Sequence, residues 1–338
     1  MPVLIQSASL FGLYAITFLV CLAANALALL LRDGMRALAP AGIALAFVAL
    51  NAVWGAAKLA APQSDIVRVA AISDAKLLSN SYRADSQAAS VDAANAYAAA
   101  IRRAADRGAR FVVTPEGGIA IRGAWRAAAY APLADAARQS GVQVVAGMLG
   151  RSPSEDIAVT FEPDGRAISY AKRRLLMPLE AEFTPGQASG ALGGGRSVAI
   201  CKDMDFPRTI RGDAADADIR MMFVPAGDFI ADGWIHARMA IMRGVENGFA
   251  VIRSANDGWL TASDAEGRLI ARSTADPHAG MSMIVADVSL GPGATLYTHI
   301  GDVLPWASAA LTLLLGALAL RRLRAKAPAY RPAVNETS

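Results

Sequence analysis

The sequence VAICKDMDFP, residues 198–207, places a cysteine at the end of a short apolar run. The run has the length and composition of a buried β-strand, and we expect a helix to begin just after it. A thiol at the N-terminus of a helix has a lowered pKa, and the resulting thiolate is a nucleophile. A buried, unreactive cysteine is the alternative interpretation of Cys201, and this stretch alone does not decide between the two.

Two other loops carry charged residues at the ends of apolar runs. Glu116 lies in TPEGG, residues 114–118, where the proline favours an extended predecessor and the glycines permit a sharp turn. Lys172 lies in YAKRRL, residues 170–175. A glutamate in such a loop could act as a base, and a lysine could stabilise an oxyanion. Taken singly, a solvated loop glutamate and a surface basic cluster are the more usual interpretations.

The region 65–298 alternates short apolar runs with helical patterns, which predicts an α/β domain whose helices cover the faces of a sheet. The expected strands are 66–72, 110–114, 142–148, 157–161, 167–170, 197–201, 219–224, 249–253, 260–262, 269–271 and 281–288. The expected helices are 85–107, 127–140 and 232–246. Catalytic residues tend to lie in the loops at strand ends, which is where the three candidate side chains are found.

Three stretches without a charged residue predict membrane-spanning helices. They cover residues 9–31, 37–57 and 303–320, and each approaches or exceeds the roughly 18–20 apolar residues that cross a bilayer. Hydrophobic residues make up 54% of the chain and charged residues 18%, a balance too apolar for a purely soluble protein. We therefore expect a membrane anchor with two transmembrane helices in residues 1–60, and a third such helix at 303–320. A buried core helix is the alternative, more so for the third stretch.

Basic residues predict the orientation of these helices. Arg32 and Arg36 lie between the first two stretches, and Arg321 and Arg322 begin a basic tail at 321–338. Positively charged flanks stay in the cytoplasm, so both segments are expected there. The domain at 65–298 then lies on the outer side. We expect a multi-pass membrane protein with this domain on the extracytoplasmic side.

Several other classes of site are not indicated. The net charge of +4 lies largely in those flanks, without interleaved aromatics, so no nucleic-acid partner is expected. Cys21 lies in the first apolar stretch and should not pair with Cys201. Residues 190–195 are glycine-rich but lack the ending of a phosphate loop, and we interpret them as a flexible surface loop. The three histidines share no ligand spacing with Cys201, so no metal or other cofactor is expected.

The order Glu116, Lys172, Cys201, each after a predicted strand, resembles the carbon–nitrogen hydrolase (nitrilase) superfamily. Tyr170, Lys172 and Leu175 match its Y-x-K-x-x-L motif. The chain is most similar to the membrane-embedded branch of that superfamily, the bacterial apolipoprotein N-acyltransferases. Residues 182–185 (EFTP) resemble the second glutamate of that branch, and residues 295–306 resemble the start of its final membrane span.

The resemblance implies an αββα sandwich with Glu116 as the base, Lys172 at the oxyanion and Cys201 as the nucleophile. It also implies supporting roles for Glu182, Asp203 and Lys202, and it offers Trp234, His236 and Glu246 as pocket residues. There are three departures from the acyltransferases. Lys202 and Asp203 stand where that branch carries an aromatic residue and a glutamate. Glu180 competes with Glu182, and only two apolar stretches precede the domain.

Three functions remain open on the sequence alone. The resemblance implies a phospholipid acyl donor, a thioester on Cys201 and an amine acceptor such as the N-terminus of an apolipoprotein. A membrane-tethered amidase that hydrolyses a small amide is the second possibility, and the short membrane part favours it. A catalytically inactive scaffold is the third, and the presence of Glu116, Lys172 and Cys201 argues against it. The sequence predicts neither the acyl chain length nor the oligomeric state.

Overall fold

The computed structural model describes residues 2–63, 65–275 and 280–326. The chain divides into two compact units, Met1–Gly301 and Asp302–Ser338, and each is described by itself. Residues 327–338 of the predicted basic tail lie outside the described residues.

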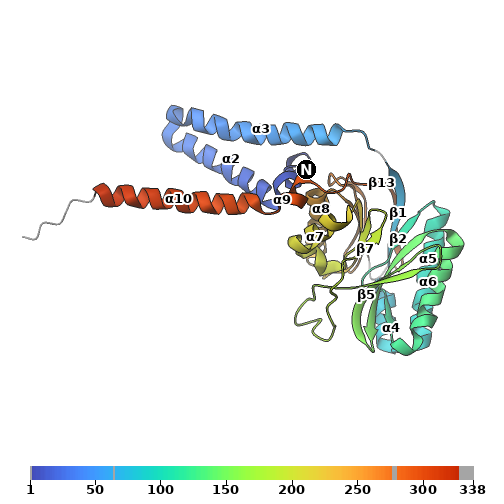
Figure 1. The fold of residues 1–338 in the computed structure, drawn as a ribbon. Helices are drawn as coiled ribbons and strands as arrows, with labels where there is room; N and C mark the ends of the chain where they lie inside the picture. The colour runs from blue at the N-terminus through green and yellow to red at the C-terminus, as the bar shows by residue number, and fades with distance from the viewer. Residues whose placement is uncertain (1, 64, 276–279, 327–338) are drawn as a thin grey trace, which may run out of the picture. The chain divides into compact units, whose positions relative to one another are not determined.

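Two mixed sheets form the centre of the first unit (Figure 1). The first sheet has the order β13-β1-β2-β4-β5-β6, with β3 beside β4. Its strands are β1 (Ile66–Ser73), β2 (Phe111–Val113), β3 (Ile119–Ile121), β4 (Gln143–Arg151), β5 (Ser154–Phe161), β6 (Ala167–Ala171) and β13 (Ser282–Ser289). The second sheet has the order β12-β11-β10-β9-β8-β7. Its strands are β7 (Ala191–Gly193), β8 (Arg196–Val198), β9 (Met221–Gly227), β10 (Ala250–Asn256), β11 (Trp259–Ser263) and β12 (Leu269–Thr274).

The two sheets pack face to face through aliphatic and aromatic side chains. Val69 and Val145 of the first sheet share one buried cluster with Phe223 and Ile252 of the second. The central strands β1, β2 and β4 are paired in parallel, as are β8, β9 and β10. Parallel strands end at the same edge of their sheet. The loop after β2 reaches the second sheet, where Glu116 N donates a hydrogen bond to the Ala226 carbonyl of β9, the strand beside β8.

Helices cover the outer face of each sheet. They are α4 (Ala75–Ala84), α5 (Gln87–Asp106), α6 (Arg126–Ser140), α7 (Pro207–Ala217), α8 (Gly233–Asn247) and α9 (Leu296–Ile300). Tyr97 and Ile101 of α5 pack against the first sheet, whereas Ile210 of α7 and Ala240 of α8 pack against the second. The layers therefore run helix, sheet, sheet, helix, which confirms the predicted αββα sandwich.

Local sequence explains where these helices begin and end. The Ser86 side chain accepts a hydrogen bond from Ala89 N at the start of α5, because the first N–H groups of a helix lack partners within it. Gly141 ends α6 in the left-handed region, which glycine adopts without steric cost. The glycine-rich stretch 190–195 differs from expectation. Its central residues form β7, which pairs with β8, so it is not simply a flexible loop.

Two long apolar helices lie at the N-terminal end of the first unit. α2 (Leu13–Asp33) and α3 (Leu38–Ala60) are joined by the short 3-10 helix η2 (Gly34–Ala37) and run side by side (Figure 1). They pack through Ala26 and Ala41, whereas Leu31 and Val53 are exposed. By length and composition the stretch Leu13–Ala60 is apolar enough to cross a membrane. The first helix begins later than the predicted residue 9, because Gly12 adopts a positive φ and interrupts it.

The second unit contains one long helix, α10 (Val303–Lys326). Its residues Val303–Leu323 form a further segment that is long and apolar enough to span a bilayer. Leu313 and Leu320 are among its exposed apolar side chains. Large exposed apolar side chains on a helix need an apolar environment to cover them, and a lipid bilayer is one such environment.

Candidate active site

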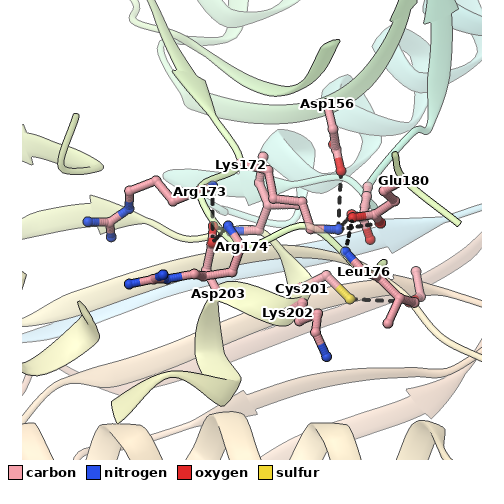
Figure 2. A network of polar contacts seen from close by, with 12 residues as sticks. Asp156, Lys172, Arg173, Arg174, Leu176, Glu180, Cys201, Lys202 and Asp203 are labelled. Atoms are coloured by element: carbon pink, nitrogen blue, oxygen red, sulfur yellow. Dashed lines mark hydrogen bonds and ion pairs between the residues drawn. The ribbon is translucent and has the colours of Figure 1, made fainter. Parts of the chain in front are cut away.

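The three predicted residues come from three different strand ends. Figure 2 shows Lys172 and Cys201 in the same cluster of side chains, and Glu116 forms an ion pair with Lys172. Glu116 lies in the loop after β2, Lys172 follows β6 directly, and Cys201 follows β8 after two residues. The Lys172 Nζ lies 2.5 Å from the Glu116 Oε1. The Cys201 Sγ donates a hydrogen bond to the Gly227 carbonyl at 3.2 Å. A carboxylate and an ammonium in direct contact beside a thiol are the groups that general base catalysis of thiol attack uses.

Backbone contacts from the second sheet hold the Glu116 loop. Glu116 N donates to the Ala226 carbonyl of β9 at 3.2 Å. The Asn256 side-chain amide of β10 donates a hydrogen bond to the Glu116 carbonyl at 3.0 Å. The Oδ1 of the same Asn256 side chain accepts a hydrogen bond from Ser73 Oγ of β1 at 2.9 Å. The loop is therefore tied to both sheets, which restricts how far its carboxylate can move.

The close approach of β4 also positions this loop, and it leads to a testable prediction. A Cβ on Gly147 would lie 2.2 Å from the Pro115 carbonyl oxygen and 2.7 Å from the Glu116 Cα, closer than atoms can approach. We expect Gly147→Ala to push the loop away and to lower the rate at which iodoacetamide alkylates Cys201 by roughly 100-fold, because displacements near 1 Å have such effects. Unfolding should become easier by about 1–3 kcal/mol through overpacking.

The matched control for this substitution is Gly212→Ala in α7, where an added Cβ meets no atom within 4 Å. This change should leave the alkylation rate unchanged and should raise the melting temperature slightly, because alanine favours helices by about 1 kcal/mol over glycine. Thermal melts and pH-controlled alkylation of both variants test the prediction. An unchanged rate in Gly147→Ala would mean that the Glu116 loop is not held by this contact.

The electrostatics at Cys201 differ from the expected lowered pKa. Burial, and after it the negative charge of Glu116, raise the pKa of this thiol well above its usual range, and Lys172 offsets only part of the effect. The helix that begins at the cysteine, η4 (Cys201–Asp205), is a short 3-10 turn, and α7 starts only at Pro207. The resting sulfur is therefore a neutral thiol, and a base has to remove its proton before it can attack.

Glu116 is in the ionised form that such a base needs. Burial by itself would raise the pKa of its carboxyl group. The positive charge of Lys172 and hydrogen bonds from Asp156, Lys172 and Cys201 outweigh burial and lower this pKa below its usual value. Cys201 itself has a φ of 40°, in the left-handed region that side chains other than glycine rarely adopt. A strained backbone of this kind is frequent where a nucleophile is presented.

Three carboxyl groups surround the Lys172 ammonium. Its Nζ lies 2.5 Å from Glu116, 2.6 Å from Glu180 Oε1 and 3.2 Å from Asp156 Oδ2. The sequence left Glu180 and Glu182 as alternatives for the second glutamate, with Glu182 given the supporting role. In the structure Glu180 lies at the ammonium, whereas Glu182 is exposed. A turn in which Glu180 N donates to the Leu176 carbonyl brings the Glu180 side chain back to the lysine.

The sequence interpretation missed Asp156. This residue lies in β5, immediately before the run of apolar residues that was expected to form that strand. Its side chain is only 1% exposed. An ionisable residue at the start of an otherwise apolar strand was the available signal, since acidic side chains are rarely buried without a functional or structural partner.

Asp203 connects the lysine loop with the cysteine turn. Its Oδ1 accepts hydrogen bonds from Arg173 N and Arg174 N at 3.1 and 2.8 Å. Its Oδ2 accepts from the Tyr170 hydroxyl at 2.7 Å and from Ile200 N at 3.0 Å. Burial raises the pKa of Asp203, and these donors act against that rise. The aspartate lies behind the reacting groups, where it can position them.

The Lys202 side chain takes no part in the cluster around Lys172. Its Nζ lies 3.7 Å from Asp205 Oδ2, and Figure 2 shows it directed away from the Lys172 ammonium. Any contribution of Lys202 to an oxyanion site therefore comes from its backbone N–H.

The three predicted pocket residues all lie on α8 but in different surroundings. The Trp234 ring packs against Trp259 with 5.0 Å between centroids, and it lines a cavity of 540 Å³ together with Ile5 of the N-terminal segment. The His236 ring nitrogens lie 3.8 Å from Asp205 and 3.5 Å from an oxygen of Asp232. His236 is thus a neighbour of the η4 turn that begins at Cys201.

Glu246 was expected to line the pocket, and the structure contradicts this. Ten residues separate it from His236, which places it roughly 15 Å further along the helix. Its Oε1 accepts a hydrogen bond from Leu13 N at 2.8 Å, and Arg243 forms an ion pair with it. A carboxylate at the first turn of a helix is favourable, so Glu246 fixes the start of α2 to the domain.

Comparisons with known proteins agree with this geometry. Residues 80–292 match the carbon–nitrogen hydrolase family. A curated relative, the apolipoprotein N-acyltransferase of Geobacter metallireducens, is 28% identical over 157 residues. That alignment covers 42% of this chain and 28% of the length of the relative.

Solved structures of the amidase from Nesterenkonia sp. AN1, of the nitrilase superfamily, share the fold. One mutant form superposes with a TM-score of 0.54 at 21% identity, covering 68% of this chain and 93% of the amidase. A second mutant shows covalent addition of the acetamide moiety of fluoroacetamide at the active site cysteine of that enzyme. It superposes with a TM-score of 0.55 at 20% identity, over 74% of this chain and 98% of the amidase. The family match extends over more than half of the chain, and this protein is therefore a member of the carbon–nitrogen hydrolase family.

Proposed function

We propose that this protein is a membrane-bound, cysteine-dependent N-acyltransferase. It moves a fatty acyl group from a phospholipid, through a thioester on Cys201, to an amine such as the N-terminus of a lipoprotein. The observation that carries the proposal is the contact of the Lys172 ammonium with the Glu116 carboxylate beside a buried thiol, in a chain with apolar helices on both sides of the domain.

The first half-reaction forms the thioester. The Glu116 carboxylate accepts the proton of the Cys201 thiol, and the sulfur attacks the carbonyl carbon of the ester. Lys172, with the backbone N–H of Lys202, stabilises the oxyanion, and each such donor contributes a few kcal/mol. As the carbonyl re-forms, the carbon–oxygen bond of the ester breaks, and the departing lysophospholipid alkoxide takes the proton back from Glu116.

The second half-reaction transfers the acyl group. The amine nitrogen attacks the thioester carbonyl carbon, and the carbon–sulfur bond breaks. One amine proton passes to Glu116 and from there to the leaving sulfur, so that the amide product and the neutral Cys201 thiol are restored. Glu116 therefore serves as base and acid in turn, which suits a carboxylate whose ionisation depends on the adjacent Lys172.

Apolar side chains on two loops beside the site support a lipid donor. Met177 and Leu179, which precede Glu180, are 64% and 67% exposed. Phe229 and Ile230, which follow the Gly227 carbonyl that accepts the thiol, are 57% and 81% exposed. Large exposed apolar groups on both sides of a catalytic centre are unfavourable in water and favourable against acyl chains.

We further propose that α2 and α3 cross the bacterial inner membrane and form the membrane anchor, residues 1–60. The catalytic domain follows at residues 65–298, and α10 crosses the membrane again at residues 303–320. Arg32 and Arg36 between α2 and α3, and Arg321 and Arg322 of the tail 321–338, then lie in the cytoplasm. Because α3 crosses the membrane once between the α2–α3 linker and the domain, the domain faces the periplasm, where lipoprotein N-termini would be accessible to it.

A membrane-tethered amidase is the second candidate. The similarity in fold to the Nesterenkonia amidase favours it. In that reaction water replaces the amine, and the thioester is hydrolysed. The chemistry at Glu116, Lys172 and Cys201 is the same for both candidates, so the acyl donor and acceptor distinguish them.

The test is the intact mass of the full chain, purified in detergent and incubated with bacterial phospholipid vesicles. We expect a mass gain of one fatty acyl group, sensitive to hydroxylamine, together with free lysophospholipid. Cys201→Ala should show neither product. Cys21→Ser, which removes the other cysteine of the chain, should keep both. No adduct, together with turnover of simple amides, would support the amidase instead.

A further inference from the structure

The site contains more carboxyl groups than its one buried lysine can balance. Oxygens of Glu116, Asp156 and Glu180 all lie within 4.8 Å of one another, with the Lys172 ammonium in contact with each. Three carboxylates beside one cation would leave two uncompensated negative charges in a mostly buried site. Like charges at this separation do not all ionise, and one group keeps its proton.

The surroundings of the three carboxyl groups indicate which one is neutral. Glu180 has the closest contact with water, with 17% of its side chain exposed, and its Oε2 accepts a hydrogen bond from Leu176 N at 2.7 Å. Glu116 has the shortest contact with Lys172, at 2.5 Å. Asp156 has the longest contact, at 3.2 Å, and is only 1% exposed.

These differences indicate that Asp156 is the neutral group, and its hydrogen bonding supports the same assignment. As a carboxylate, neither of its oxygens accepts a hydrogen bond from any of the residues that the structure describes. An ionised carboxylate buried without such donors is costly, because only the Lys172 ammonium at 3.2 Å, which it shares with two other carboxyl groups, offsets the loss of water. As a carboxylic acid it carries its own donor, and a neighbouring carboxylate oxygen of Glu116 is the natural acceptor.

We propose that Asp156 is protonated in the resting enzyme and that this neutral acid donates a hydrogen bond to Glu116, holding the Glu116 carboxylate in position as the base. Asp156 is thus a positioning residue, and it does not touch the substrate. The inference rests on the proposed role of Glu116 as the base, and it is independent of which acyl donor the enzyme uses.

The electrostatics of the neighbouring groups support this assignment. Burial raises the pKa of Asp156 well above its usual value, and the negative charges of Glu116 and Glu180 raise it further. The Lys172 ammonium acts in the opposite direction and does not outweigh them. The hydrogen bond from Asp156 in turn helps to lower the pKa of Glu116, so the proton on one carboxyl group keeps the other ionised.

Two substitutions of similar size separate a neutral donor from a charged partner. Asp156→Asn keeps a neutral side chain with donor hydrogens, whereas Asp156→Leu removes every donor. The readout is the rate of Cys201 alkylation by iodoacetamide against pH, measured on the full chain in detergent with Cys21→Ser in every variant. Alkylation requires the thiolate that Glu116 generates, and it needs no lipid substrate.

We expect the rate of Cys201 alkylation in Asp156→Asn to lie within about threefold of the parent, since a neutral hydrogen-bond donor to Glu116 is retained. The pH at which the alkylation rate falls on the acidic side of the pH–rate profile should also be unchanged. Asp156→Leu should react on the order of tenfold or more slowly, because it loses a hydrogen bond to a charged group. In that variant the fall on the acidic side should move to higher pH. The base works only when ionised, and loss of this donor raises the pKa of Glu116.

An infrared measurement reads the proton directly. Full-length protein labelled with ¹³C at the aspartate carboxyl groups should show the carbonyl band of a buried carboxylic acid near neutral pH, and Asp156→Asn should lack that band. This readout stands even if Asp156→Leu does not fold. The proposal is overturned if the band is absent from the parent, or if Asp156→Asn is as impaired as Asp156→Leu. A failed phospholipid assay would leave both readouts interpretable, so the two proposals can fail separately.

Discussion

Replacing Lys172 with methionine is expected to abolish turnover and to destabilise the domain. The ammonium is 1% exposed and contacts the Glu116, Glu180 and Asp156 carboxyl groups. Without it the developing oxyanion loses a donor, and the pKa of Glu116 rises so that less of the base is ionised. Loss of an oxyanion donor alone costs about 10²–10³-fold. We expect a decrease in Cys201 acylation of at least about 10³-fold, because the effect on the base adds to it.

The same substitution should make stability depend differently on pH. The folded-state pKa of Glu116 is lowered, so this group contributes stability above its unfolded pKa, and the contribution is lost as pH falls through the folded pKa. Lys172→Met removes that contribution and leaves carboxylates buried without a cation. Breaking a buried ion pair in this way costs about 3–5 kcal/mol. The loss of stability in Lys172→Met, relative to the parent, should be greatest near pH 8. It should shrink towards pH 5, because the buried carboxyl groups of the variant, which have lost their cation, take up protons there.

Thermal melts between these pH values, with acylation rates measured alongside, check the prediction. Cys201→Ala is the matched control, because it removes the reacting group from the same site without changing a charge on Lys172 or its partners. That variant should be inactive and close to the parent in melting temperature at each pH. A Lys172→Met protein whose destabilisation grows as the pH falls would contradict the described charge arrangement.

Asp203→Ala is expected to lower both the stability of the domain and its activity, with the second largest effect of the substitutions considered. The carboxylate accepts hydrogen bonds from Arg173 N, Arg174 N and Ile200 N. Its removal leaves one buried donor, Ile200 N, and two partly buried donors without that acceptor. Each unsatisfied buried group costs about 1–3 kcal/mol. Allowing for partial relaxation, we expect a loss of about 3–5 kcal/mol, which corresponds to a fall in melting temperature of roughly 10 °C.

Activity should decrease together with stability in Asp203→Ala. The three orphaned N–H groups lie on both sides of the site, one before Cys201 and two directly after Lys172, so the two loops lose their common anchor. Tyr170→Phe is the control, because it removes only the fourth donor to Asp203, at 2.7 Å. It should cost no more than about 1.5 kcal/mol. A fall in melting temperature of equal size in both variants would show that the backbone contacts contribute little.

Much of the architecture could be predicted from local patterns. Apolar runs bounded by turn residues corresponded to most of the buried strands, because a strand buried on both faces excludes polar side chains along its length. The uncharged stretches became α2, α3 and α10, since helices are the way an apolar chain satisfies its backbone away from water. The boundary at Gly12 was missed, because it depends on a positive φ that composition does not reveal.

The order of Glu116, Lys172 and Cys201 was visible because each follows a predicted strand. Their meeting depends on the packing of two sheets, since β2 and β6 belong to one sheet and β8 to the other. The sequence could not choose between Glu180 and Glu182. Their spacing from Lys172 differs by only two residues, and the choice depends on one turn of the loop that follows the lysine. Nor could it place Glu246, which lies on the same helix as His236 but at its other end.

The sequence by itself determined the α/β domain and the apolar helices, which follow from periodicity and composition along the chain. The sandwich and the three residues that we expect to react came from the resemblance to the family, which rests on motifs and on their order. Only the tertiary structure decided that the Cys201 thiol is neutral at rest, that Asp156 joins the lysine cluster, and that Asp203 ties the two catalytic loops together. Desolvation and charge–charge interaction depend on the distances between groups far apart in the chain, and those distances exist only once the two sheets have packed against each other.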